Sequence, residues 1–78
     1  MPHVIVKLWP GQSQEQKTRL ATELTKAVTA TLGYGEESVS VGIEEVPSND
    51  WNEKAYKSDI LAKQETIYKQ PGYDPKSF

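Results

Sequence analysis

The chain has 78 residues, about half the usual length of a single domain, and no cysteine. A core of this size supplies only roughly 3–5 kcal/mol of stability, so such folds rely on disulfides, a metal or partner subunits. With no cysteine and one histidine, His3, the sequence favours subunit association and predicts no metal site. The net charge of −2, with nine basic residues interspersed among eleven acidic ones, argues against nucleic-acid binding.

The absence of cysteine also excludes thiol nucleophiles and a secreted scaffold built on disulfides. No apolar run approaches the roughly 20 residues that are needed to span a bilayer. We therefore expect a soluble cytoplasmic domain that makes no contact with membranes.

The segment from His3 to Trp9 is rich in β-branched and aromatic residues and alternates with a period of two. Val4, Val6 and Leu8 share one face, which predicts a strand with an apolar side. Pro10-Gly11 ends this strand, because proline has no N–H to donate to a sheet.

A helix is predicted next, because Ser13 to Gln16 has the form of a capping box, with a hydroxyl at the start and a glutamine three residues later. Apolar residues then recur at spacings of three and four and form a stripe: Leu20, Leu24, Ala27, Val28 and Leu32. Gly33 and Gly35 end the helix.

The second strand is predicted from Ser38 to Val46, with Val39, Val41 and Ile43 on one face. Because a helix separates the two strands, a parallel βαβ unit over residues 1–46 is the simplest topology. A lone pair of strands leaves its edges and one face in water. We therefore expect two units to pair into a four-stranded sheet with the helices on one face.

Residues 47–70 are predicted to form a turn and a second helix. Asp50 and Glu53 have the spacing of a helix cap, and we place the helix at about Trp51 to Lys69. Residues 71–78 are expected to form a tail. The whole chain is therefore predicted to be a single α+β domain.

The first two residues are Met1 and Pro2, and the methionine is expected to be removed because proline is small. Pro2 then carries a free secondary amine, which is a general base if its pKa lies below that of a free prolyl amine. Burial against apolar surface lowers the pKa of an amine, because desolvation disfavours the ammonium form. Parallel strands start at the same end of a sheet, so we expect Pro2 to lie near Val39 and Ser40.

Three segments resemble the 4-oxalocrotonate tautomerase family over about residues 2–52: Pro2 to Val6, Gly11 to Lys17 and Ser38 to Val41. The similarity to its dimeric branch of PptA-type phenylenolpyruvate tautomerases extends over nearly the whole chain, through these residues: Trp9-Pro10, Ser40, Trp51 and Lys69 to Tyr73. The resemblance implies a tautomerase-like fold and a homodimer, with a hexamer as the alternative. It also implies an isomerase that needs no cofactor and uses Pro2 as base and then as acid.

The same resemblance implies which residues bind the substrate. Better-known members carry substrate-gripping arginines at the positions of Gln12 and Ser40, so this pocket suits a small enol acid such as an arylpyruvate enol. The expected substrate-binding residues are Ser40, Trp51, Lys7 and Trp9. Packing in the core or at the helix start is the alternative for Trp51, and solvent or a dimer seam is the alternative for Lys7.

Two other functions stay open. One is hydration or dehalogenation of an unsaturated acid, with Glu53 activating water, although Glu53 also fits a structural helix cap. The other is a dimeric binding module without catalytic activity that has kept the fold and lost the arginines. Replacing Pro2 by alanine separates this module from a tautomerase, because only the enzyme loses a proton transfer.

Overall fold

The computed structural model describes residues 1–74, so positions 75–78 of the predicted tail lie outside the described residues. The chain divides into two compact units, residues 1–45 and residues from Val46 onward. The elements follow in this order: β1 (His3–Leu8), α1 (Gln14–Leu32), η1 (Glu36–Ser38), β2 (Ser40–Glu45), η2 (Ser48–Asp50), η3 (Asn52–Leu61) and η4 (Gln64–Thr66).

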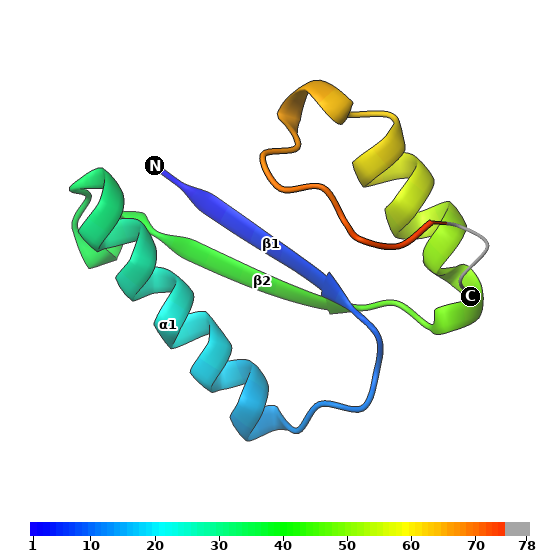
Figure 1. Ribbon diagram of the computed structural model, residues 1–78. Coiled ribbons are helices and arrows are strands. Elements are labelled where there is room, and N and C mark those ends of the chain that lie inside the picture. The colour runs from blue at the N-terminus through cyan, green and yellow to red at the C-terminus, as the bar shows by residue number, and fades with distance from the viewer. Residues whose placement is uncertain (75–78) are drawn as a thin grey trace. The chain divides into compact units, whose positions relative to one another are not determined.

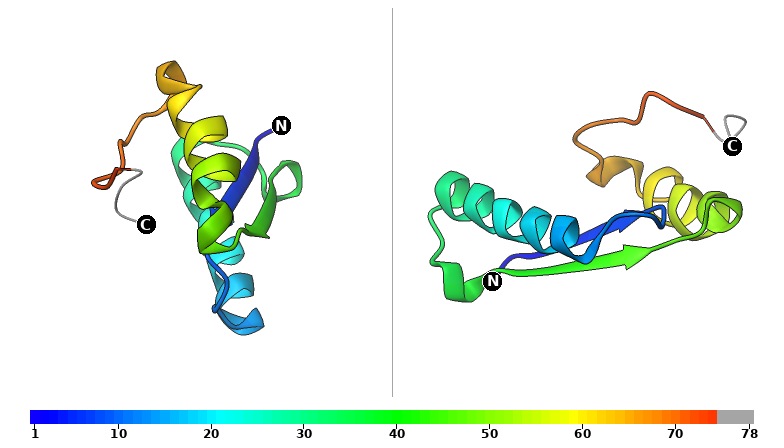
Figure 2. Two further views of the ribbon diagram at one scale, coloured as in Figure 1. Left: turned by 90° about the vertical axis from the view of Figure 1, so that its right-hand side faces the viewer. Right: turned by 90° about the horizontal axis from the view of Figure 1, so that it is seen from below.

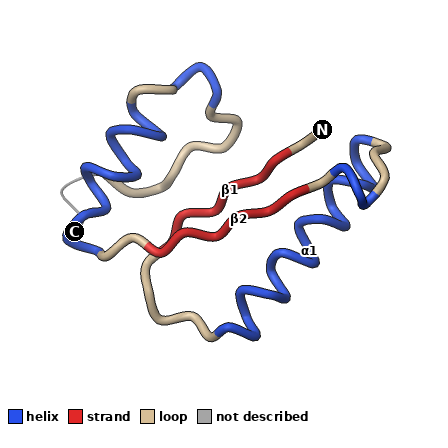
Figure 3. Tube along the Cα trace, turned by 180° about the vertical axis from the view of Figure 1, so that it is seen from behind, coloured by secondary structure: helices blue, strands red, loops and turns tan. Residues whose placement is uncertain are grey.

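In the first unit, β1 and β2 form a parallel pair, which confirms the predicted βαβ topology (Figure 3). The register places His3 directly opposite Ser40, so both strands start at the same end. β2 begins two residues later than predicted, because residues 36–38 form a 3₁₀ turn in which the Ser38 hydroxyl donates to the Gly35 carbonyl at 2.9 Å. Trp9 lies just outside β1.

α1 connects the strands and runs along one face of the pair (Figures 1 and 2). The predicted capping box is present: the Gln16 N–H donates to Ser13 Oγ at 3.0 Å, and the Ser13 N–H donates to Gln16 Oε1 at 2.8 Å. Gly33 ends the helix with a φ of 79°, in the left-handed region, and its N–H donates to the Thr29 carbonyl at 3.0 Å. Both helix boundaries are therefore set by local hydrogen bonds.

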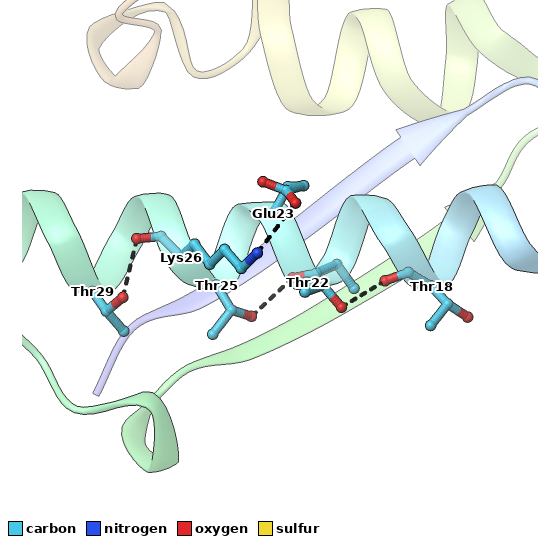
Figure 4. A network of polar contacts seen from close by, with 7 residues as sticks. Thr18, Thr22, Glu23, Thr25, Lys26 and Thr29 are labelled. Carbon is cyan, nitrogen blue, oxygen red and sulfur yellow. Dashed lines mark hydrogen bonds and ion pairs between the residues drawn. The ribbon is translucent and has the colours of Figure 1, made fainter.

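One flank of α1 carries a row of threonines (Figure 4). The hydroxyls of Thr22, Thr25 and Thr29 each donate to a carbonyl three or four residues earlier, at 3.1, 2.8 and 3.0 Å. Together with Thr18 and Val41 they line a shallow groove of about 360 Å³ between α1 and β2. The hydroxyls of Thr22, Thr25 and Thr29 donate within the helix, so their hydrogens are not available to a ligand in the groove.

The single chain buries very little apolar surface. Among residues 1–74, only Val46 and Ala55 are buried hydrophobic residues. In the predicted stripe on α1, Leu20, Leu24 and Val28 are half-buried, while Ala27 and Leu32 are exposed. A strand pair covered on one face by one helix leaves these side chains without a second layer to pack against.

In the second unit, η3 is a π-helix, and the N–H of Ala62, which follows it, donates to the Lys57 carbonyl five residues earlier at 3.0 Å. The predicted second helix is therefore present, but it is wound as a π-helix and is shorter than the predicted range of 51–69. It ends at Leu61, because Lys63 has φ −126° and ψ 39°, which leaves the helical region.

The predicted helix cap by Asp50 and Glu53 is also wrong, because within residues 1–74 no side chain caps the start of η3. Lys57 Nζ donates to Glu53 Oε1 at 2.7 Å, and Lys54 Nζ lies 3.6 Å from Asp50 Oδ2. Each carboxylate stands four residues before its lysine, a spacing that brings opposite charges together on a helix. These ion pairs take up the groups that were predicted to cap.

Within the described part of the chain, no helix is long and apolar enough to cross a membrane.

Candidate active site

The start of the strand pair brings Pro2, His3 and Ser40 together. The Ser40 N–H donates to the Pro2 carbonyl oxygen at 3.2 Å, and Ser40 Oγ lies 2.6 Å from His3 Nδ1. Because the register places Ser40 opposite His3, one residue of β2 contacts the Pro2-His3 dipeptide through both its backbone and its side chain. These two links hold the residue that precedes β1 in a defined position.

The sheet face next to this cluster is open. His3 and Ser40 are both exposed, and Pro2 is half-buried. The next pair in register on the same face is Ile5 opposite Gly42, and no described atom lies within 4 Å of a Cβ built on that glycine. Ile5 is itself 55% exposed. A polar pair therefore borders an accessible apolar surface.

Other predicted site residues lie at the opposite end of β1. Lys7 follows Pro2 by five residues, which is roughly 16 Å along a strand that rises about 3.3 Å per residue. Trp9 comes after the strand and is 47% exposed. Gln12 lines a hollow of about 170 Å³ together with Lys17. Within the first unit, the predicted residues thus form two separate groups, with Pro2 and Ser40 at one end and Lys7 and Trp9 at the other, near Gln12, the position of a missing family arginine.

In the second unit, the aromatic residue Trp51 is held by a residue far along the chain. The Trp51 indole N–H donates to the Tyr73 hydroxyl at 3.1 Å, and the Tyr73 ring packs against Tyr56 at 5.9 Å between centroids with a 54° tilt. Tyr73 therefore fixes the orientation of the indole. The sequence analysis missed this contact, because no local spacing connects two residues that are 22 positions apart.

His3 is the second residue whose contact the sequence analysis missed, since it was considered only as a metal ligand. The parallel pairing of the predicted strands brings their starts to the same end of the sheet, but aligning their predicted first residues would set His3 opposite Ser38. The pairing of His3 with Ser40 therefore required the observed register. Among the residues that the structure describes, no group of three His, Asp or Glu side chains is placed to hold a metal ion.

The parallel βαβ unit of this chain has the fold of a solved homologue of 4-oxalocrotonate tautomerase, which places the chain in the tautomerase fold class. The profile of the Tautomerase enzyme family matches residues 2–52. The chain belongs to this family, within its 4-oxalocrotonate tautomerase branch, and is therefore an isomerase.

Individual relatives agree with this assignment. A probable tautomerase of Xylella fastidiosa is 42% identical over 73 residues, which cover 94% of this chain and 89% of the relative. Tautomerase PptA of Cronobacter sakazakii is 36% identical over 75 residues, which cover 95% and 99% of the two chains. The crystal structure of YwhB, a homologue of 4-oxalocrotonate tautomerase, is 43% identical with a TM-score of 0.58, over 59% of this chain and 75% of that chain.

Proposed function

We propose that this tautomerase ketonises small enol acids, such as an arylpyruvate enol, with Pro2 as the general base once Met1 has been removed. The observation that carries this proposal is the anchoring of the Pro2 carbonyl by the Ser40 N–H at 3.2 Å, directly before β1. The proline nitrogen is thereby held at the end of the sheet, beside an open surface. Met1 is 92% exposed, so no packing protects it from an aminopeptidase.

The proposed reaction moves one proton from oxygen to carbon. The unprotonated Pro2 nitrogen takes the proton of the enol O–H, and the electron pair of that bond becomes the new C=O bond. The electron pair of the C=C bond then takes the proton back from the prolinium nitrogen, which restores the base. No electron or group is gained or lost, so the reaction needs no cofactor. With Met1 still attached, the Pro2 nitrogen is a tertiary amide and has no basic lone pair.

We assign Ser40 and Trp51 to substrate binding, together with Lys7 and Trp9 from a second subunit. The length of β1 separates Lys7 and Trp9 from Pro2 of the same chain, which supports a site completed by another copy. The small buried core supports the same assembly, because a fold of this size relies on partner subunits for stability. A homodimer is the smallest assembly that meets both requirements.

The test is the rate of phenylenolpyruvate ketonisation by protein whose processed N-terminus has been verified by mass. Pro2→Ala, which replaces the cyclic secondary amine by a primary one, is expected to lower kcat about a hundredfold or more, the lower range for loss of a positioned base. Circular dichroism and the size of the assembly should not change. An unaltered rate in a folded variant would contradict the assignment of Pro2. No rate above buffer with the native protein would favour a binding module.

A further inference from the structure

We propose that His3 is a specificity-determining residue that acts with Ser40 as one hydrogen-bonding unit and binds a single substrate carboxylate beside Pro2. This inference rests on the proposed function of Pro2. Its basis is two contacts of Ser40. Ser40 Oγ lies 2.6 Å from His3 Nδ1, and the Ser40 N–H donates to the Pro2 carbonyl oxygen at 3.2 Å. Both side chains are exposed, so a ligand reaches them.

The number of hydrogen-bond donors in the pair follows from its chemistry. A neutral imidazole has one N–H, and a serine hydroxyl has one O–H. The contact between His3 and Ser40 uses one of these two donors, whichever way it runs. If the hydroxyl donates to Nδ1, the Nε2–H is left for a ligand. If Nδ1–H donates to Oγ, the hydroxyl hydrogen is left, so one oriented donor is available in both cases.

This donor pair differs from an arginine in a way that selects the substrate. Arginine carries a permanent charge and a fork of donors that matches a carboxylate in two places. His3 and Ser40 offer one neutral donor and, next to it, the apolar surface of Ile5 above the open position at Gly42. We therefore expect a 2-oxo acid with one carboxylate and an apolar substituent to fit this end of the sheet.

The test is the affinity for phenylpyruvate, the keto form, measured by titration calorimetry. His3→Phe keeps a planar ring without nitrogens, and Ser40→Ala removes the hydroxyl. Each variant is expected to raise Kd about tenfold, the loss typical of one hydrogen bond to a charged group. KM for phenylenolpyruvate should rise by a similar factor with kcat nearly unchanged, because the ground state and the transition state share this contact.

Further variants separate this role from a merely structural one. The double variant should bind no more weakly than either single variant, because the pair works as a unit. His3→Asn should restore most of the affinity, since its amide replaces the ring nitrogen as partner of the hydroxyl. Ser38→Ala is the matched control, because Ser38 Oγ also makes one hydrogen bond, to the Gly35 carbonyl at 2.9 Å. Its Kd should equal that of the parent.

A matched ligand completes the test. Phenylacetone has the same ring and ketone as phenylpyruvate and no carboxylate, so all variants should bind it equally. An unchanged Kd for phenylpyruvate in His3→Phe, an additive loss in the double variant, or an equal loss for phenylacetone would overturn the proposal. Because binding is measured at equilibrium and does not depend on the rate of proton transfer, a failure of Pro2 as the base is distinguishable: Pro2→Ala would then keep its rate while His3→Phe still weakened binding.

Discussion

The two units of the chain are held together by different kinds of interaction. In residues 1–45, the order comes mainly from the backbone: a parallel strand pair, a capping box at the start of α1 and a left-handed glycine at its end. In the second unit, side chains that are distant in sequence contact one another, with Trp51 bonded to Tyr73 and Tyr73 packed on Tyr56. Among residues 1–74, both buried hydrophobic residues, Val46 and Ala55, belong to the second unit, so the apolar side chains of the unit that carries the proposed base are at least partly accessible.

If the backbone organises the first unit, then disturbing the end of α1 should have the largest effect on stability. Gly33→Ala places a Cβ at a φ of 79°, which costs an L residue about 1–2 kcal/mol. Urea denaturation at fixed protein concentration measures the change in the free energy of unfolding. Gly42→Ala is the control, with a negative φ and no described atom within 4 Å of the added carbon, and should change stability by less than about 0.5 kcal/mol. Equal losses in both variants would contradict this account.

The aromatic contact of the second unit should have a smaller effect. Tyr73→Phe removes the hydroxyl that accepts the Trp51 N–H, and the expected loss is about 1 kcal/mol, typical of one hydrogen bond. In a Trp9→Phe background, the emission spectrum should shift as well, because Trp51 is then the only tryptophan. Tyr68→Phe is the control, since Tyr68 is 98% exposed. A spectrum that responds to Tyr68 and not to Tyr73 would refute the contact.

The smallest effect is expected at Glu53. Its carboxylate is paired with Lys57 four residues later at 2.7 Å, and both side chains are more than half exposed. After allowance for solvent screening, Glu53→Gln should cost about 0.5 kcal/mol or less. The ketonisation rate should not change, because Pro2 performs the proton transfer. A large loss of rate in a folded variant would instead support chemistry in which Glu53 activates water.

Only part of the candidate site in the first unit was predictable from the sequence. The proximity of Pro2 and Ser40 follows from the parallel pairing of two recognisable strands, so it was expected before the structure was known. The His3 contact needed the residue-by-residue register as well. The expectation that Lys7 and Trp9 bind substrate came from the family resemblance, which does not say which subunit supplies them. Their distance from Pro2 along β1 became clear only in the folded chain.

Both ends of α1 and the parallel pairing of the strands were predictable from local sequence patterns. Capping between Ser13 and Gln16 acts over three residues, and the left-handed turn at Gly33 depends on that residue alone. The π winding of η3, the contact between Trp51 and Tyr73 and the contact between His3 and Ser40 emerged only from the folded chain. The physical reason is sequence separation. The two contacts join residues that are 22 and 37 positions apart, so their geometry depends on how whole elements pack.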